Sequence, residues 1–130
     1  MCRLAWTSIV VALMTTSSMA HHGYTEYDRN AAVTLEGTVR RVLWTNPHVV
    51  LTLEARNGVV YSVEWAAVTQ LSRQGIETAP VKEGDTLVVT GSINRNPEKR
   101  ILTLLQEIRR PADGWQWISQ ARASQSAPKG

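Results

Sequence analysis

The stretch VVLTLEARNGVVYSVEW, residues 49–65, has the pattern of a β-hairpin. Apolar and polar residues alternate along residues 49–55 and again along residues 59–65, as they do in strands that bury one face. Between the two runs, Asn57-Gly58 is a strong signal for a tight turn, which needs residues that tolerate a positive φ. The inward faces are predicted to be Val49, Leu51, Leu53 and Ala55, followed by Val59, Tyr61, Val63 and Trp65.

The segment before the hairpin predicts one long, bent strand. Residues 33–39 alternate, and the alternation slips by one residue at Arg40-Arg41 before the apolar side continues at Val42. Such a slip is typical of a β-bulge, which bends and twists a strand. Gly37 also permits a sharp bend. A long, bent first strand is what a small closed barrel needs.

The segments after the hairpin complete the order of elements. Residues 66–75 change to a helical period, and residues 86–92 and 100–109 have the pattern of two further strands. Three strands, a short helix and two strands is the order of the OB-fold, a five-stranded barrel. We therefore predict an all-β fold with one short helix. An OB-like barrel is expected over residues 31–110 and a flexible tail over residues 111–130.

The first twenty residues have the three parts of a signal peptide. Arg3 provides a positive charge, residues 4–14 are largely apolar, and Ser18-Met19-Ala20 has small residues at the positions that signal peptidase recognises. The apolar run is too short to anchor the chain in a bilayer. We expect cleavage after Ala20, a periplasmic or secreted protein without a stable membrane anchor, and a polar segment over residues 21–30.

Composition narrows the classes of function. The 130 residues suit one domain, and the net charge of +3 falls to about +2 once Arg3 is removed. The only cysteine is Cys2, so the mature chain would have no disulfide, thiolate metal site or cysteine nucleophile. The sequence contains no phosphate loop, dinucleotide-binding fingerprint or nucleophile elbow. It therefore favours a binding protein over an enzyme.

The histidines are the candidate metal ligands, and there are three of them: His21, His22 and His48. Cleavage after Ala20 would give His21 a free amine, which can chelate one metal ion together with the ring Nδ1. His22 can add a third nitrogen. Amine and neutral imidazole nitrogens favour Cu(II) among the divalent metals of the first transition row. We therefore predict a transition-metal site, with copper as the leading metal.

His48 ends the segment WTNPH, residues 44–48. Its parity places it away from the barrel core. Pro47 fixes the backbone ahead of it, Asn46 is biased toward extended geometry, and Trp44 is expected to pack in the core. The sequence leaves open whether His48 meets His21 in space. His48 could equally cap a strand through a hydrogen bond.

Two other functions are open at the level of sequence. An envelope protein without a metal could dock a protein partner through the barrel edge or through Trp115 and Trp117. A copper-dependent oxidative enzyme would use the same His21. Export and the modest charge argue against a nucleic-acid partner for the scattered arginines. A monomer or a weakly associating protein is expected.

Several stretches resemble the exported bacterial family called domain of unknown function (DUF) 6152. They are His21-His22-Gly23, Tyr27-Asp28, residues 33–39, WTNPH at 44–48, Trp65, residues 71–75 and residues 84–86. The family usually has Ser where this chain has Gly23. The resemblance implies export and an OB-like barrel, and it carries no established activity. The prediction of copper therefore comes from the histidines alone.

Overall fold

The computed structural model describes residues 27–127, without the side chains of residues 28–30. Its elements, in chain order, are β1 (Tyr27–Leu43), β2 (Val50–Ala55), β3 (Val60–Glu64), α1 (Val68–Arg73), β4 (Thr86–Asn94), the 3₁₀ turn η2 (Pro97–Lys99), β5 (Ile101–Arg110), β6 (Trp115–Ile118) and α2 (Gln120–Ser126).

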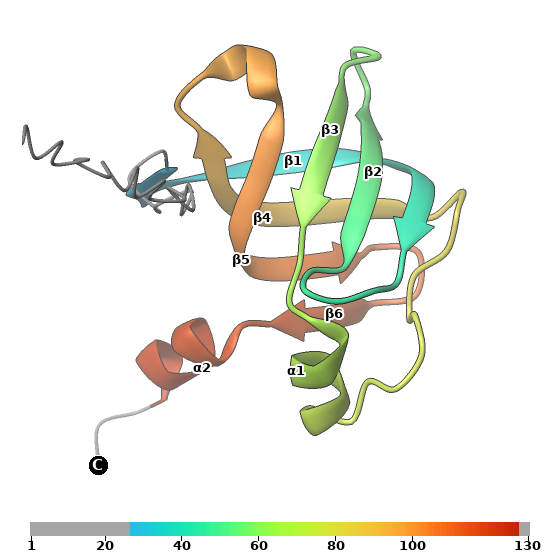
Figure 1. The fold of residues 1–130 in the computed structure, drawn as a ribbon, viewed down its shortest axis with the longest axis vertical. Coiled ribbons are helices and arrows are strands. Elements are labelled where there is room, and N and C mark those ends of the chain that lie inside the picture. The colour runs from blue at the N-terminus through green and yellow to red at the C-terminus, as the bar shows by residue number, and fades with distance from the viewer. Residues whose placement is uncertain (1–26, 128–130) are drawn as a thin grey trace, which may run out of the picture.

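The first five strands form a closed barrel. The strand order is β3-β2-β1-β4-β5-β6, and β3 also pairs in parallel with β5, at Ser62 with Ile101 and at Val63 with Leu102. This second pairing closes the sheet on itself. α1 lies below the barrel, between β3 and β4 in the chain (Figure 1). The predicted all-β, OB-like barrel with one short helix before β4 is therefore confirmed.

The bend in β1 lets one strand serve two neighbours. Residues 32–38 pair with β4, and residues 37–43 pair with β2. The register against β2 shifts between Val39 and Arg41, where the sequence predicted a bulge. Gly37 pairs with both Ala55 of β2 and Leu87 of β4, so it lies where β1 passes from one neighbour to the other.

The core follows the predicted alternation. Val49, Leu51 and Leu53 of the first hairpin strand are fully buried, as is Val63 of the second. α1 contributes the buried Leu71. Burying one face of each strand supplies the main driving force for the fold. The other buried apolar residues are Val39, Trp65, Val81, Leu87, Val89, Leu102, Leu105, Ile108 and Trp117.

The prediction of a flexible tail over residues 111–130 differs from the structure. Residues 115–118 form β6, which pairs with β5, and α2 follows over residues 120–126. The reason is tertiary packing, because Trp117 is buried with its ring 5.4 Å from that of Trp65. β1 begins at Tyr27, within the polar segment of residues 21–30.

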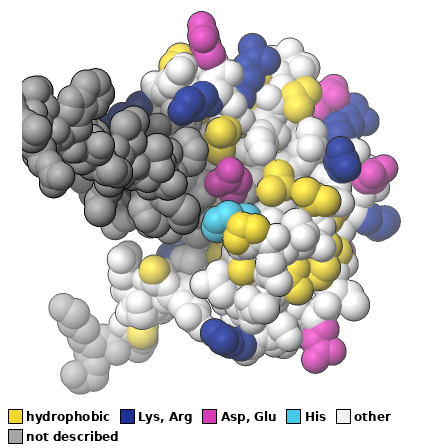
Figure 2. All heavy atoms as spheres, in the orientation of Figure 1, with side chains coloured by type: hydrophobic (Ala, Val, Ile, Leu, Met, Phe, Trp, Pro, Cys, Tyr) yellow, Lys and Arg dark blue, Asp and Glu magenta, His cyan; other side chains and the backbone are white. Residues whose placement is uncertain are grey.

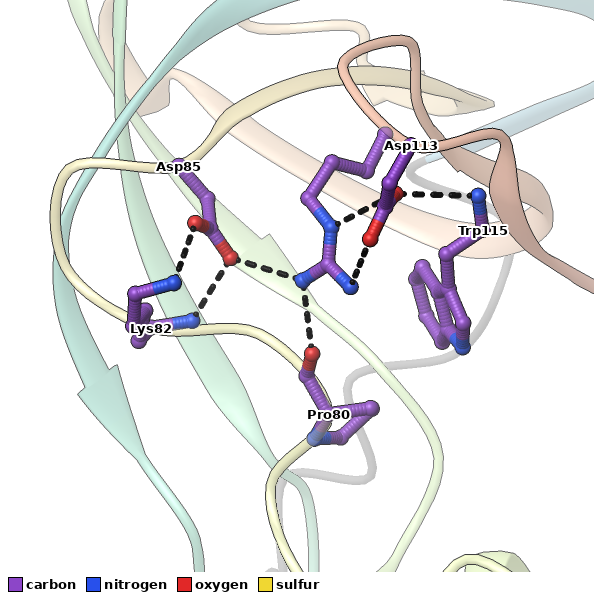
Figure 3. A network of polar contacts seen from close by, with 6 residues as sticks. Pro80, Lys82, Asp85, Asp113 and Trp115 are labelled. Carbon is purple, nitrogen blue, oxygen red and sulfur yellow. Dashed lines mark hydrogen bonds and ion pairs between the residues drawn. The ribbon is translucent and has the colours of Figure 1, made fainter.

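Arg110 fixes the turn that leads into β6. Its guanidinium donates to both oxygens of Asp113, at 3.0 and 2.9 Å, and to Asp85 at 2.9 Å (Figure 3). It also donates to the carbonyl of Pro80 at 2.8 Å and lies over the ring of Trp115. One side chain thus joins the loop before β4, the end of β5 and the start of β6.

The expected signal peptide and its cleavage site lie outside the described residues, as do His21 and His22. Among residues 27–127, no helix has the length and apolar character needed to cross a membrane.

Candidate functional site

A cavity of about 590 Å³ opens where the closing edge of the barrel meets the loops around it. Its walls come from segments far apart in the chain: the start of β1, the loop before β2, the end of β3 and the two residues after it, the first turn of α1, the end of β4, η2 and β5. The lining residues are Tyr27, His48, Glu64, Trp65, Ala66, Gln70, Asn94, Lys99, Ile101, Thr103, Leu104 and Leu105.

His48 stands at this cavity with its side chain exposed, as parity predicted. It is the only histidine among the described residues, and Figure 2 shows its side chain in cyan on the molecular surface, beside an acidic group. Backbone hydrogen bonds extend the hairpin ladder to Val49, the residue after His48, from Val49 N to Ala66 O and from Trp65 N to Val49 O. The strand geometry therefore fixes the backbone of His48.

The imidazole of His48 is oriented by the backbone opposite. Its Nδ1 lies 3.3 Å from the carbonyl oxygen of Trp65. Because a carbonyl can only accept, this contact requires the proton on Nδ1. The lone pair of the neutral ring is then on Nε2. A histidine that donates one nitrogen to a carbonyl and offers the other is the usual form of a metal-binding histidine.

The residues before His48 hold the loop in place. The Asn46-Pro47 peptide bond is cis. Asn46 Oδ1 accepts from Thr69 N at 3.4 Å, which ties the loop to the first turn of α1. Trp44 is half-buried and packs edge-on against Trp65, with 6.1 Å between ring centroids. Trp44, Asn46 and Pro47 therefore position His48 and do not themselves line the cavity.

Glu64 shares the face of His48. Glu64 pairs with Val50, and His48 lies two residues before Val50 on the same side of the strand. Diagonal neighbours of this kind in an antiparallel pair lie within reach of long side chains. The side chain of Glu64 forms no hydrogen bond or ion pair with the other described residues. In the sequence, the alternation of residues 59–65 puts Glu64 on the outward face, where a carboxylate is usually solvated. The signal that could have placed it near His48 is the Asn57-Gly58 turn, which sets the pairing of the two hairpin strands.

The described part of β1 starts at the same cavity. Tyr27 is the first described residue of β1 and lines the cavity with His48. His22 is five residues before it in the chain. A chain of five residues spans at most about 18 Å, so covalent geometry permits His21 and His22 to reach the cavity.

The described residues do not hold a complete metal site of their own. No group of three or more histidine, cysteine, aspartate or glutamate side chains in residues 27–127 could hold a metal ion. His48 and Glu64 are two such side chains at the cavity, so a metal here would need further ligands from elsewhere.

Two of the arginines that could have formed a nucleic-acid surface are paired with carboxylates. Arg40 donates to Glu54 at 2.8 Å, and Arg56 donates to Glu36. The hydrogen bond from Arg40 lowers the pKa of Glu54 and keeps that carboxylate charged. These pairs reduce the positive charge that a phosphate backbone would meet on this side of the barrel.

Comparison with protein families gives a match that includes the N-terminal segment and the hairpin. Residues 9–103 match the family described as family of unknown function (DUF6152). The chain belongs to the DUF6152 family. The match includes His21, His22, His48 and Glu64, so the candidate site of this DUF6152 protein lies within the family's matched region. No curated protein matches the chain.

Proposed function

We propose that this DUF6152 protein is an exported, periplasmic or secreted protein that binds a transition metal, with copper as the leading candidate. The ligands are the amine and ring of His21, the ring of His22 and Nε2 of His48. The observation that carries the proposal is that Tyr27 and His48 line one cavity. The described part of the strand that follows the paired histidines therefore starts at the cavity that His48 also lines.

The donor chemistry fits the metal. Nitrogen ligands from imidazole and amine groups suit Cu(II), which binds most tightly among the divalent first-row metals. The contact of His48 Nδ1 with Trp65 O leaves Nε2 as the donor, so this ligand is oriented before the metal arrives. Glu64 adds a negative charge on the same face, which favours a cation.

The docking alternative has less support at Trp117, because this side chain is buried against Trp65 and not available to a partner. An oxidative enzyme would need the same metal first. Metal binding is therefore the function to test before partner docking or oxidative activity.

The test is a Cu(II) titration of the protein produced by export, with its N-terminus established by intact mass. We expect one copper per chain, and about 10- to 100-fold weaker binding for His48→Ala and for His21→Ala. Protein acetylated at the amine of His21 is a matched control, because it keeps all three imidazoles and removes the chelate of amine and ring. It should also bind more weakly. Unchanged affinity in His48→Ala would overturn the proposal.

A further inference from the structure

The cavity beside His48 has features of a small-molecule site that the metal proposal does not use. A volume of about 590 Å³ lies in the range of about 300–1,000 Å³ in which proteins bind small organic ligands. Much of its wall is apolar and comes from β5 and the end of β3: Trp65, Ile101, Leu104 and Leu105. Such a wall favours the apolar body of a ligand.

The charged side chains of the wall differ in whether they already have a partner. Among the described residues of the wall, one is a carboxylate, Glu64, and one is an ammonium group, Lys99. Lys99 has an interaction of its own. Glu64 is half-buried, and its side chain forms no hydrogen bond or ion pair with the other described residues. A carboxylate next to an apolar wall is strengthened as a partner for a cation, because less water screens it.

Two further observations mark this wall as unusual. The indole Nε1 of Trp65 is buried and has no hydrogen-bond partner within the described chain, and such groups are rare in folded proteins. Leu104 has a φ of +49°, a conformation that leucine seldom adopts. It accompanies a register shift between β4 and β5, which turns the strand where it borders the cavity. Strained residues tend to gather at binding sites.

We infer that this cavity binds a small organic cation, a protonated amine on an apolar body, with the ammonium group at Glu64 and the body against Ile101, Leu104 and Leu105. Amine and carboxylate together form a charge-assisted hydrogen bond, which is stronger than a neutral one. The inference does not rest on metal binding, because it uses neither His21 nor His22.

The experiment uses hexylamine as the probe, with hexan-1-ol and hexanoate as controls of the same chain length. Each is titrated into the exported protein in the presence of EDTA, at neutral pH. Binding is followed by the ¹H–¹⁵N resonances of the indole groups, with that of Trp65 assigned through Trp65→Phe. We expect saturable binding of hexylamine, accompanied by a shift of the Trp65 resonance. Hexan-1-ol should bind about 10-fold more weakly or worse, and hexanoate should bind more weakly still.

Two variants test the role of the carboxylate. Glu64→Gln should bind hexylamine and hexan-1-ol with similar affinity, because only the charge is removed. Glu83→Gln, which removes an exposed carboxylate in the turn before β4, should keep the preference for the amine.

A third variant tests the cavity itself. Ala66→Leu, which fills the cavity from its wall, should abolish binding of both compounds. The inference is overturned if hexylamine does not saturate, if the alcohol binds equally well, or if Glu64→Gln retains the preference. EDTA removes metal ions from this experiment. Its outcome therefore does not depend on whether the protein binds copper, and a failed copper titration would not contradict it.

Discussion

At the scale of single residues, Gly37 shows how little space the barrel leaves where β1 changes neighbours. A Cβ atom at Gly37 would lie 2.4 Å from the carbonyl oxygen of Glu54 and 2.8 Å from its carbon. Both atoms belong to the backbone of β2, which cannot move aside as a flexible side chain can. In the sequence, Gly37 indicates a position where the strand can bend. The close approach of two strands gives a second reason for glycine here.

We therefore expect Gly37→Ala to lower the free energy of unfolding by about 3 kcal/mol, since overpacking in a closed structure forces the backbone to shift. Urea denaturation followed by circular dichroism measures the change. Thr38→Ala is the control, because this neighbour already carries a Cβ and lies half-exposed. Equal stability of the Gly37→Ala variant and the wild type would show that β2 can move away at no cost.

At the scale of elements, β6 is the part of the fold that seals the barrel core from below. Trp65 packs edge-on against Trp115 and Trp117, with centroid distances of 6.5 and 5.4 Å. The indole N–H of Trp117 donates to Gln74 Oε1 at 2.8 Å, just after α1. α2, which follows, has no buried residue. The two elements of this segment therefore contribute unequally to stability.

Truncation separates the two contributions. A chain that ends at Pro111 loses the cover over Trp65, and we expect it to lose about 3–5 kcal/mol of unfolding free energy, as for removal of a large buried aromatic residue. A chain that ends at Ser119 keeps β6 and should remain close to the full protein. Thermal denaturation of both measures the difference. A chain ending at Pro111 that melted with the full protein would mean that β6 adds nothing to the core.

The strands and the barrel could be predicted from sequence because their signals are local. Alternation, the slip at Arg40-Arg41 and the Asn57-Gly58 turn each lie within a few residues of what they specify. β6 could not be predicted, since its four residues form a strand only by packing on Trp65, far away in the chain. The cavity was missed for the same reason. Glu64 has the local pattern of an exposed carboxylate, and only closure of the barrel brings it together with Ile101 and Leu104.

At the scale of the whole molecule, Arg110 and Asp85 connect segments that the sheet alone does not hold. Burial raises the pKa of Asp85, but hydrogen bonds from the backbone and side chain of Lys82 and from Arg110 outweigh it, so the pKa lies below its ordinary value. The backbone of the same turn is also tied to β1, because Val39 N donates to Asp85 O and Gly84 N donates to Val39 O.

The lowered pKa makes part of the stability dependent on acid. The pKa of an aspartate in an unfolded chain is about 3.9. The contribution of Asp85 to stability is therefore fully present above that pH, and it is lost as the pH falls through the lower pKa of the folded protein. We expect Asp85→Asn to cost about 1–2 kcal/mol at pH 7. Urea denaturation between pH 7 and pH 2.5 should show this gap closing below about pH 4. The control Glu83→Gln should follow the wild type throughout, and a gap for Asp85→Asn that persisted at pH 2.5 would contradict this assignment.

The cover that Trp117 places over Trp65 has a consequence for the timing of assembly. The barrel strands are complete once β5 has been made, yet the face that holds Trp65 stays open until the residues of β6 follow. A chain that is made from its N-terminus to its C-terminus therefore passes through a stage in which the barrel is nearly complete and the indole of Trp65 is still uncovered. The uncovered apolar surface at that stage favours aggregation, and a short strand near the end of the chain brings the stage to a close.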